Sequence, residues 1–367
     1  MNPFYDRLKL EIRALGGMHN AHLHLDRAGT LDDRYIDPNE HRMLDNFSVS
    51  LHEKHRLIHA IHTGPAYEEA DLRRRVHACL DEMTACDTRR ADTLVDVCAD
   101  VVGLSALETL RAIQSERGDI ELRLASYSPL GFPQDSPERW ELLERGAELS
   151  DFVAALPESD DVVDYPGHIG FEEHCRRMLH LAKQNDCMLH VHTDQRNDPG
   201  ENGTERLLDA MEKYGGPAGA AGKPAVWAVH MISPSTYEED RFERLVKRML
   251  EHNLGLICCP SAALGMRQLR PRQTPTYNSI PRVLELLAAG VNVRLASDNI
   301  ADICSPSTTP NLVDEVFVLS AALRYYHTGV LAKLACGVSL SEDDRELIAV
   351  HLSEDAVEVN KALGNHA

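Results

Sequence analysis

The chain has 367 residues, of which 43% are hydrophobic and 26% charged, a composition typical of globular proteins. Its formal net charge of −20 argues against nucleic acid as a partner, and no apolar run is long enough to span a membrane. The nine cysteines follow no paired framework, and the N-terminus lacks the basic and apolar segments of a signal peptide, so we expect a reduced, cytoplasmic protein. No linker or internal repeat divides the chain, which predicts a single domain over residues 1–367.

Strand-like and helix-like segments alternate along almost the whole chain. Eight short apolar stretches bounded by turn residues are predicted to be strands: residues 18–26, 93–101, 121–127, 151–156, 187–192, 225–230, 255–259 and 291–296. Helices are predicted between them, and the residues from 311 onward are also predicted to be helical. This alternation predicts an α/β fold, a (β/α)8 TIM barrel with extra C-terminal helices. An open doubly wound sheet would usually carry a glycine-rich phosphate turn after an early strand, and none is present.

His22 and His24 stand two positions apart in the first predicted strand. Side chains at such positions leave the same face of a strand, so both imidazoles can approach one metal ion. Neutral imidazole is a good ligand for zinc or ferrous iron. Two histidines on a strand are more often a polar edge or a structural pair, so this pair carries little weight alone. The other histidine-rich stretch, residues 41–62, is polar and is expected to lie on a solvated helix or loop.

Further polar residues stand at the ends of later predicted strands. His192 ends the fifth strand, His230 ends the sixth, and Asp298 follows the eighth. TIM barrels gather their catalytic groups at these C-terminal strand ends. Each residue alone could be structural, and Asp298 could cap the following turn. Together with the first-strand pair they predict a site for one divalent ion, with an open position for water.

The chain resembles the amidohydrolase superfamily and, within it, the cytosine-deaminase-like branch. The resemblance is carried by residues 22–26, 131–134, 192–195, 228–230, 289–293 and 297–298, and the Phe-Pro-Gln segment at 132–134 points to this branch. It implies one divalent ion, zinc or iron, held by four ligands: His22, His24, His192 and Asp298. It also implies that His230 contacts the substrate and the water held by the metal, and that Gln134 bonds a ring amide of the substrate. The alternative for Gln134 is a plain loop amide.

These residues together predict a hydrolytic mechanism. A divalent ion lowers the pKa of bound water from 15.7 towards ~7. Asp298 can then act as the general base, accepting the proton of that water and passing it to the leaving nitrogen. His230 can stabilise the negative charge that develops on the substrate.

Three features depart from the branch. Gln195 occupies the position of a glutamate that carries a proton to the ring nitrogen; as an amide it can only exchange hydrogen bonds with a substrate carbonyl or ring N–H. Residues 299–306 lack the aromatic side chain that the family sets against a pyrimidine, which argues against cytosine itself. The first strand begins near residue 17 and the C-terminus is helical, so the small β-sandwich usual in the family is not expected.

The leading interpretation is a metal-dependent hydrolase that cuts a C–N bond, other than a peptide bond, in a small nitrogen heterocycle. Hydrolysis of a cyclic amide or imide is slightly favoured, because it needs only activated water and Asp298. Deamination of an amino-heterocycle, which the resemblance favours, normally needs the missing glutamate. A third interpretation is a binding protein that kept the barrel and lost catalysis through Gln195. The sequence leaves open whether the chain forms a homo-oligomer.

Overall fold

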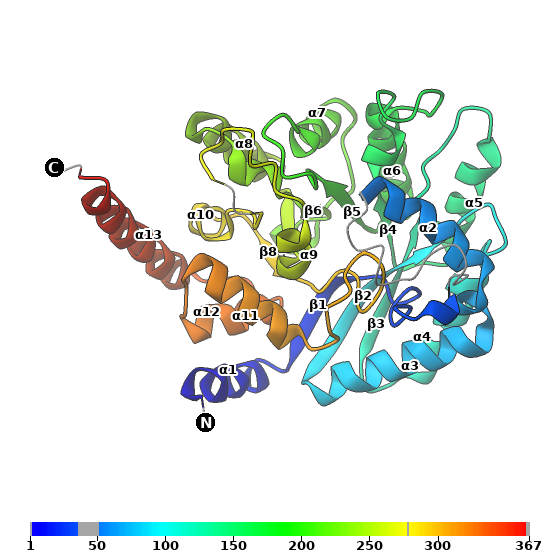
Figure 1. Cartoon of the computed structure of the whole chain (residues 1–367), viewed down its shortest axis with the longest axis horizontal. Helices are drawn as coiled ribbons and strands as arrows, with labels where there is room; N and C mark the ends of the chain where they lie inside the picture. The colour runs from blue at the N-terminus through cyan, green and yellow to red at the C-terminus, as the bar shows by residue number, and fades with distance from the viewer. Residues whose placement is uncertain (1, 36–50, 277–278, 365–367) are drawn as a thin grey trace.

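The computed structural model describes residues 2–35, 51–276 and 279–364, and its centre is one sheet of eight parallel strands in sequential order. The strands are β1 (Met18–Leu23), β2 (Thr88–Asp96), β3 (Glu121–Tyr127), β4 (Phe152–Ala155), β5 (Met188–Thr193), β6 (Val226–His230), β7 (Gly255–Cys258) and β8 (Val293–Leu295). A parallel bridge between Leu23 and Asp298 brings the two edges of the sheet together (Figure 1). The predicted TIM barrel is therefore confirmed.

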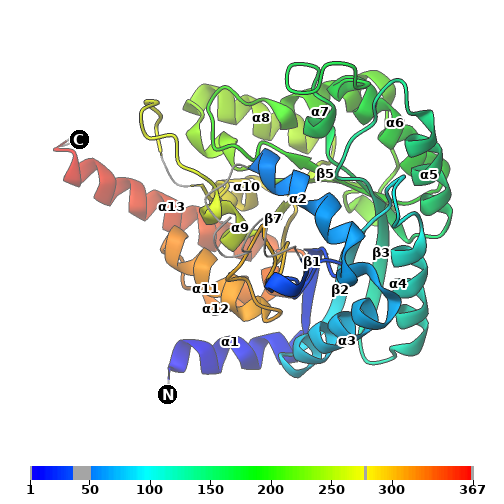
Figure 2. The ribbon, with the colours of Figure 1, turned by 45° about the vertical axis from the view of Figure 1, so that its right-hand side comes forward.

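Helices surround this barrel, as Figure 2 shows from a second direction. They are α1 (Pro3–Ala14), α2 (Leu51–Thr63), α3 (Glu69–Ala85), α4 (Ser105–Glu116), α5 (Pro137–Glu148), α6 (Phe171–Gln184), α7 (Gly203–Tyr214), α8 (Glu239–Glu251), α9 (Pro260–Gly265), α10 (Val283–Ala289), α11 (Leu312–Leu323), α12 (Thr328–Ala335) and α13 (Glu342–Ala362). None of the helices in the described ranges is long and apolar enough to cross a bilayer.

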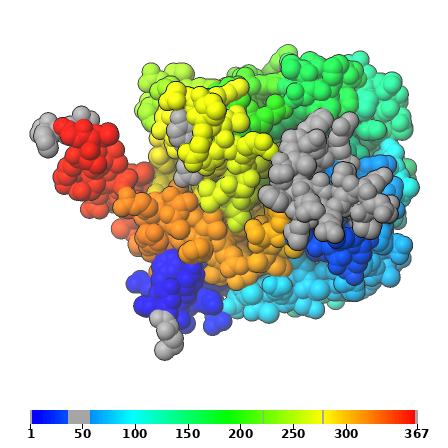
Figure 3. Space-filling view, in the orientation of Figure 1, coloured from blue at the N-terminus to red at the C-terminus, as the bar shows by residue number. Residues whose placement is uncertain are grey.

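The C-terminal part is helical, as predicted. Helices α11 to α13 lie on one side of the barrel, where α12 packs against α1, and the far end of α13 projects from the body of the molecule (Figure 3). Within residues 2–35, 51–276 and 279–364 the eight-stranded sheet is the only sheet, so these parts contain no β-sandwich.

Strand β2 differs from the prediction. It runs over Thr88–Asp96, whereas the sequence pattern placed it at 93–101. The first residues of this strand are polar, which hid it from a search for apolar runs. Inside the barrel these polar groups are paired, because Arg90 Nε donates to Asp92 and His19 Nε2 lies 2.9 Å from the same carboxylate. The strand also ends earlier than predicted, so Asp96 is its last residue and lies beside the site.

The helices cover the outer faces of the strands with apolar side chains. On α3 an apolar stripe at helical spacing is buried and consists of Leu72, Val76, Leu80 and Met83. These residues pack with Leu23 and Leu25 of the first strand region and with the outer faces of β2 and β3. Burial of this kind contributes about 25 cal/mol per Å² of apolar surface. The packing of α3 against these strands holds the strand ends in place and thereby positions the side chains of the site.

Candidate active site

A cavity of about 810 Å³ opens at the C-terminal ends of the strands. Its lining includes His24, His192, His230, Asp298, Gln195 and Arg27. Sites in TIM barrels lie at this end, and volumes of about 300–1,000 Å³ are usual for small-molecule pockets. The cavity is thus the candidate active site.

Four predicted ligand side chains meet at one end of this cavity: His24, His192 and Asp298 line it, and the fully buried His22 contacts His192. Ring nitrogens of His22, His24 and His192 all lie within 4.8 Å of one another, and the three side chains are buried. His22 Nε2 is 3.2 Å from His192 Nε2. Asp298 Oδ1 lies 3.4 Å from His24 Nε2 and 3.8 Å from His22 Nε2, so its carboxylate faces the imidazoles.

The donor set fits a divalent cation. Burial, reinforced by the neighbouring imidazole of His192, holds the pKa of His22 well below its ordinary value. His192 Nδ1 is 3.0 Å from the carbonyl oxygen of Ala155, which can only accept, so its ring proton lies on Nδ1 and its Nε2 offers a lone pair. Neutral imidazoles such as those of His22 and His192, together with the carboxylate of Asp298, are the kinds of ligand that zinc or ferrous iron prefers.

His24 does not yet have the hydrogen-bond pattern of a ligand. Arg27 Nη2 lies 2.6 Å from His24 Nδ1, and a guanidinium can only donate. Burial, followed by the charge of Arg27, holds the pKa of His24 well below its usual value, so the ring is neutral and its proton is on Nε2. Binding of a metal through His24 Nε2 therefore requires Arg27 to leave Nδ1 or the ring to give up its proton.

His230 and Asp298 both stand where the backbone turns sharply at the end of a strand. Their φ angles are 75° and 62°, in the left-handed region that side chains other than glycine rarely adopt. Such strained positions are often found in functional sites. The His230 ring centroid is 5.4 Å from that of His192, and its Nδ1 has no hydrogen-bond partner among the described residues. Burial lowers the pKa of His230 to about 4, despite the opposing charge of Asp298.

Gln195 lines the cavity and is held from behind by a residue that the sequence analysis missed. Gln195 Nε2 donates to Glu158 Oε2 at 3.0 Å, and the backbone N–H of Asp194 donates to Glu158 Oε1 at 2.7 Å. Burial and the charge of Asp194 raise the pKa of Glu158 to about 7. Glu158 follows β4 in a 3-10 turn, η4 (Pro157–Asp160), so its position after a strand end was the one signal available.

A second buried carboxyl group lies near Glu158. Glu201 Oε2 accepts from the backbone N–H of Arg196 at 2.8 Å and from the hydroxyl of Ser233. Burial, with the charges of Glu158 and Asp194, raises the pKa of Glu201 to about 9. Glu201 thus stores a proton close to Gln195, although it does not line the cavity.

Gln134 is not brought to the cavity. Its side chain is exposed, and Nε2 donates to the backbone carbonyl of His168 at 3.0 Å. The loop carrying Gln134 is drawn towards η4, since the backbone N–H of Phe132 donates to Asp160 Oδ1 at 2.6 Å. In this arrangement Gln134 acts as a loop amide, so the substrate contact predicted for it is not supported by the geometry.

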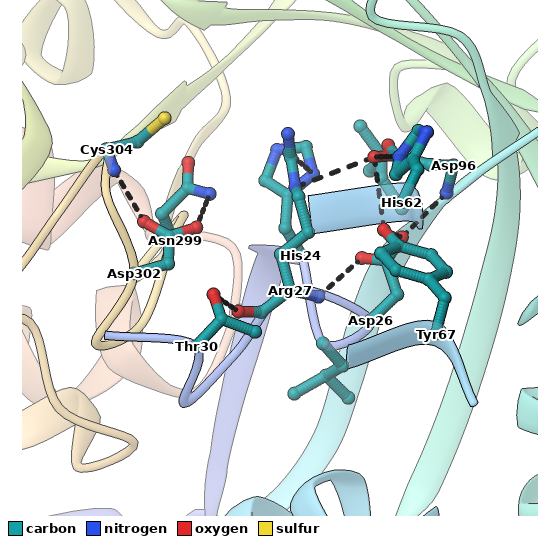
Figure 4. A network of polar contacts seen from close by, with 12 residues as sticks. His24, Asp26, Arg27, Thr30, His62, Tyr67, Asp96, Asn299, Asp302 and Cys304 are labelled. Atoms are coloured by element: carbon teal, nitrogen blue, oxygen red, sulfur yellow. Dashed lines mark hydrogen bonds and ion pairs between the residues drawn. The ribbon is translucent and has the colours of Figure 1, made fainter. Parts of the chain in front are cut away.

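A buried polar network runs from the cavity to α2 (Figure 4). Tyr67 donates to Asp26 Oδ2 at 2.9 Å, and the backbone N–H of Asp96 donates to the same oxygen at 2.8 Å. His62 Nε2 lies 3.1 Å from Asp96 Oδ2, and Arg27 Nε lies 3.7 Å from it. The network therefore fixes Arg27, which in turn contacts His24.

The expectation of a solvated stretch at 41–62 holds for His59, which is exposed, and is wrong for His62; His41 and the side chains of His52 and His55 lie outside what the structure describes. His62 is buried, and its Nδ1 lies 2.8 Å from Asp100 Oδ2. Burial alone would lower its pKa, but hydrogen bonds to Asp100 and Asp96 raise it to about 9. Cys98 lies close enough to complete a metal-like group with His62 and Asp100. The ion pairs of the charged His62 imidazole with Asp96 and Asp100 explain why these side chains lie together without a metal ion.

The sequence is similar to two curated proteins. An uncharacterized protein of Haemophilus influenzae is 26% identical over 287 residues, which cover 78% of this chain and 96% of that protein. A pterin deaminase of Rhizobium rhizogenes is 23% identical over 265 residues, 71% of this chain but only 56% of the relative. No protein-family model matches the chain.

Solved structures with a similar fold include a deaminase and an aminohydrolase. A 5-methylcytosine deaminase from Klebsiella pneumoniae with 5-fluorocytosine bound has a TM-score of 0.70 and 23% identity, covering 92% of this chain and 75% of that one. An N-isopropylammelide isopropylaminohydrolase from Burkholderia multivorans has a TM-score of 0.62 and 19% identity, covering 91% and 82%. The chain thus shares its fold with these two enzymes, as the predicted resemblance implied.

Proposed function

We propose that this protein is a metal-dependent amidohydrolase that cuts a C–N bond, other than a peptide bond, in a small nitrogen heterocycle. The observation that carries the proposal is the convergence of four side chains, His22, His24, His192 and Asp298, of which the last three line the cavity. The names of the similar proteins support it, since they act on a pterin, 5-methylcytosine and N-isopropylammelide.

The four ligand residues would hold one zinc or iron ion. When bound, that ion would lower the pKa of water towards ~7 and so supply a nucleophile near neutrality. Asp298 takes a proton from the water as its oxygen adds to the sp² carbon of the ring, and delivers that proton to the nitrogen as the C–N bond breaks. His230, neutral at physiological pH, lines the cavity and donates a hydrogen bond to the oxygen that becomes negative.

Gln195 bears on which bond is cut. Its Nε2 is held by Glu158, which leaves Oε1 as an acceptor for an N–H of the ligand. An amide or imide ring supplies such an N–H, and its leaving nitrogen can take the proton from Asp298. We therefore favour hydrolysis of a cyclic amide or imide without release of ammonia.

Deamination is the second candidate. It is favoured by the names of the similar proteins and by Glu158, a carboxyl group with a pKa of about 7 directly behind Gln195. A catalytically impaired binding protein on the same barrel is the third candidate, and any turnover would exclude it.

A substrate screen separates these candidates. Protein loaded with zinc or ferrous iron would be incubated with lactams, cyclic imides, pterins and amino-pyrimidines, and the products assayed for ammonia, free amine and ring opening. Ring opening without ammonia supports the favoured reaction, whereas stoichiometric ammonia supports deamination. Binding of ring compounds without turnover by the metal-loaded protein would contradict the hydrolase proposal. Asp298→Asn serves as the control for contaminating activity.

A further inference from the structure

His190 lies in β5 two positions before His192, one layer deeper in the barrel, and it is fully buried. Its Nδ1 is 3.3 Å from Nδ1 of His22, and the two ring centroids are 5.5 Å apart. The other ring nitrogen, His190 Nε2, has no hydrogen-bond partner among the described residues. His190 was not singled out by its sequence, and no step of the proposed mechanism uses it.

Two facing Nδ1 atoms at this distance share one proton. The contact is a hydrogen bond only if one Nδ1 carries the proton and the other carries a lone pair. Each neutral ring carries a single N–H, and only one of the two can donate across the contact. The pair therefore has two arrangements, which differ in the tautomer of both rings.

The two arrangements differ at the cavity. If His190 donates, the proton of His22 lies on Nε2 and points at His192 Nε2, 3.2 Å away, which accepts it. If His22 donates, its Nε2 has a free lone pair directed at the cluster. Only the second arrangement lets His22 bind a metal ion, because a protonated ring nitrogen has no lone pair to give.

We propose that His190 is the positioning residue that accepts the Nδ1 proton of His22 and so holds His22 in its metal-binding tautomer. This inference rests on the proposed metal centre. His190 does for His22 what the carbonyl of Ala155 does for His192, at 3.0 Å from that ring's Nδ1. Such partners of metal-binding histidines fix the ring orientation and the tautomer, and their loss typically costs about 10–100-fold in metal affinity.

Three variants test this role. His190→Asn can place its amide oxygen where Nδ1 of His190 lies, so it keeps an acceptor for His22. His190→Gln is equally polar, but its amide lies one bond farther from the backbone and so cannot occupy the position of Nδ1. His190→Leu has no hydrogen-bond acceptor. Phe152→Leu is the packing control, because the Phe152 ring contacts His190 at a centroid distance of 4.7 Å and makes no hydrogen bond with it.

The measurement is zinc affinity by competition with a chelator, together with the visible spectrum of the cobalt(II) form, which reports the number of ligands. We expect affinity to fall by about 10–100-fold in His190→Leu and His190→Gln, and to stay near that of the wild type in His190→Asn and Phe152→Leu. If His190→Leu fails to fold, the comparison of the Asn and Gln variants decides. Equal affinity in those two would overturn the inference, while the metal centre would stand if the wild type binds zinc. A wild type that binds no zinc would overturn both.

Discussion

The amide nitrogen of Gln195 donates to Oε2 of Glu158 at 3.0 Å, so a carboxyl group with a pKa of about 7 lies directly behind the cavity wall. This contact joins the turn after β5 to the turn after β4. Glu158 is therefore a candidate proton donor next to Gln195, the position at which the cytosine-deaminase-like enzymes are expected to carry a glutamate.

Replacement of Gln195 by Glu tests the consequence. Two carboxyl groups in contact cannot both ionise easily, so Gln195→Glu should share one proton with Glu158 at neutral pH. We expect weaker hydrolysis of the amide-type substrate and the appearance of a trace of ammonia release from amino-heterocycles, measured with a coupled ammonia assay. The double variant with Glu158→Gln is the control. If the wild type already releases stoichiometric ammonia, another carboxyl group, Glu158 or Glu201, has taken over the missing proton transfer.

Asp298→Asn tests the general base. Its carboxylate oxygen lies 3.4 Å from His24 Nε2, and the isosteric amide cannot accept a proton. We expect the fold to persist and turnover to fall by a factor on the order of 10² to 10⁴. Metal content must be measured with the rate, because loss of metal would indicate that Asp298 is needed as a ligand. A variant that keeps both its metal and most of its activity would exclude Asp298 as the base.

Metal content is the third prediction. Protein purified without chelator should contain about one equivalent of zinc or iron by elemental analysis, as expected for one four-ligand site. Removal of the metal should abolish turnover and lower the unfolding temperature, because a ligand that binds only the native state stabilises it. His22→Ala should bind less metal, whereas His174→Ala, a buried histidine bonded to Asp160 away from the cluster, should not. Full activity of a metal-free preparation would exclude the proposed mechanism.

His62 makes stability depend on pH. Its pKa is raised to about 9 from 6.5, so the ion pairs with Asp96 and Asp100 stabilise the folded state fully below pH 6.5, and that stability is lost as the pH rises through 9. The raised pKa corresponds to a free energy on the order of 3 kcal/mol. We would measure the free energy of unfolding in urea at pH 6, 8 and 10. The wild type should have a larger free energy of unfolding than His62→Gln, and the difference should be greatest at pH 6 and smallest at pH 10. A difference that does not change with pH would show that His62 is held by packing instead.

Much of the fold follows from local patterns in the sequence. The period of two in strands and of about 3.6 in helices depends only on neighbouring residues, so the order of elements and the apolar stripe of α3 can be predicted. Parallel strands in a barrel all end at one rim, so His22, His192, His230 and Asp298 could be placed together without coordinates. Strand β2 was misplaced because its polar first half is paired inside the barrel, which no local pattern shows.

The partners of these residues were decided by closure of the barrel. Glu158 behind Gln195, His62 between Asp96 and Asp100, and His190 against His22 are contacts between residues 34 to 168 positions apart. The sequence supplies each side chain but not its neighbour, because hydrogen bonding depends on distances of about 3 Å between atoms. The same reason explains Gln134, whose motif predicted a substrate contact but whose loop is bonded to η4 and turns the amide outward. The tertiary structure alone sets those distances, and with them the tautomers and proton positions on which the chemistry of the site depends.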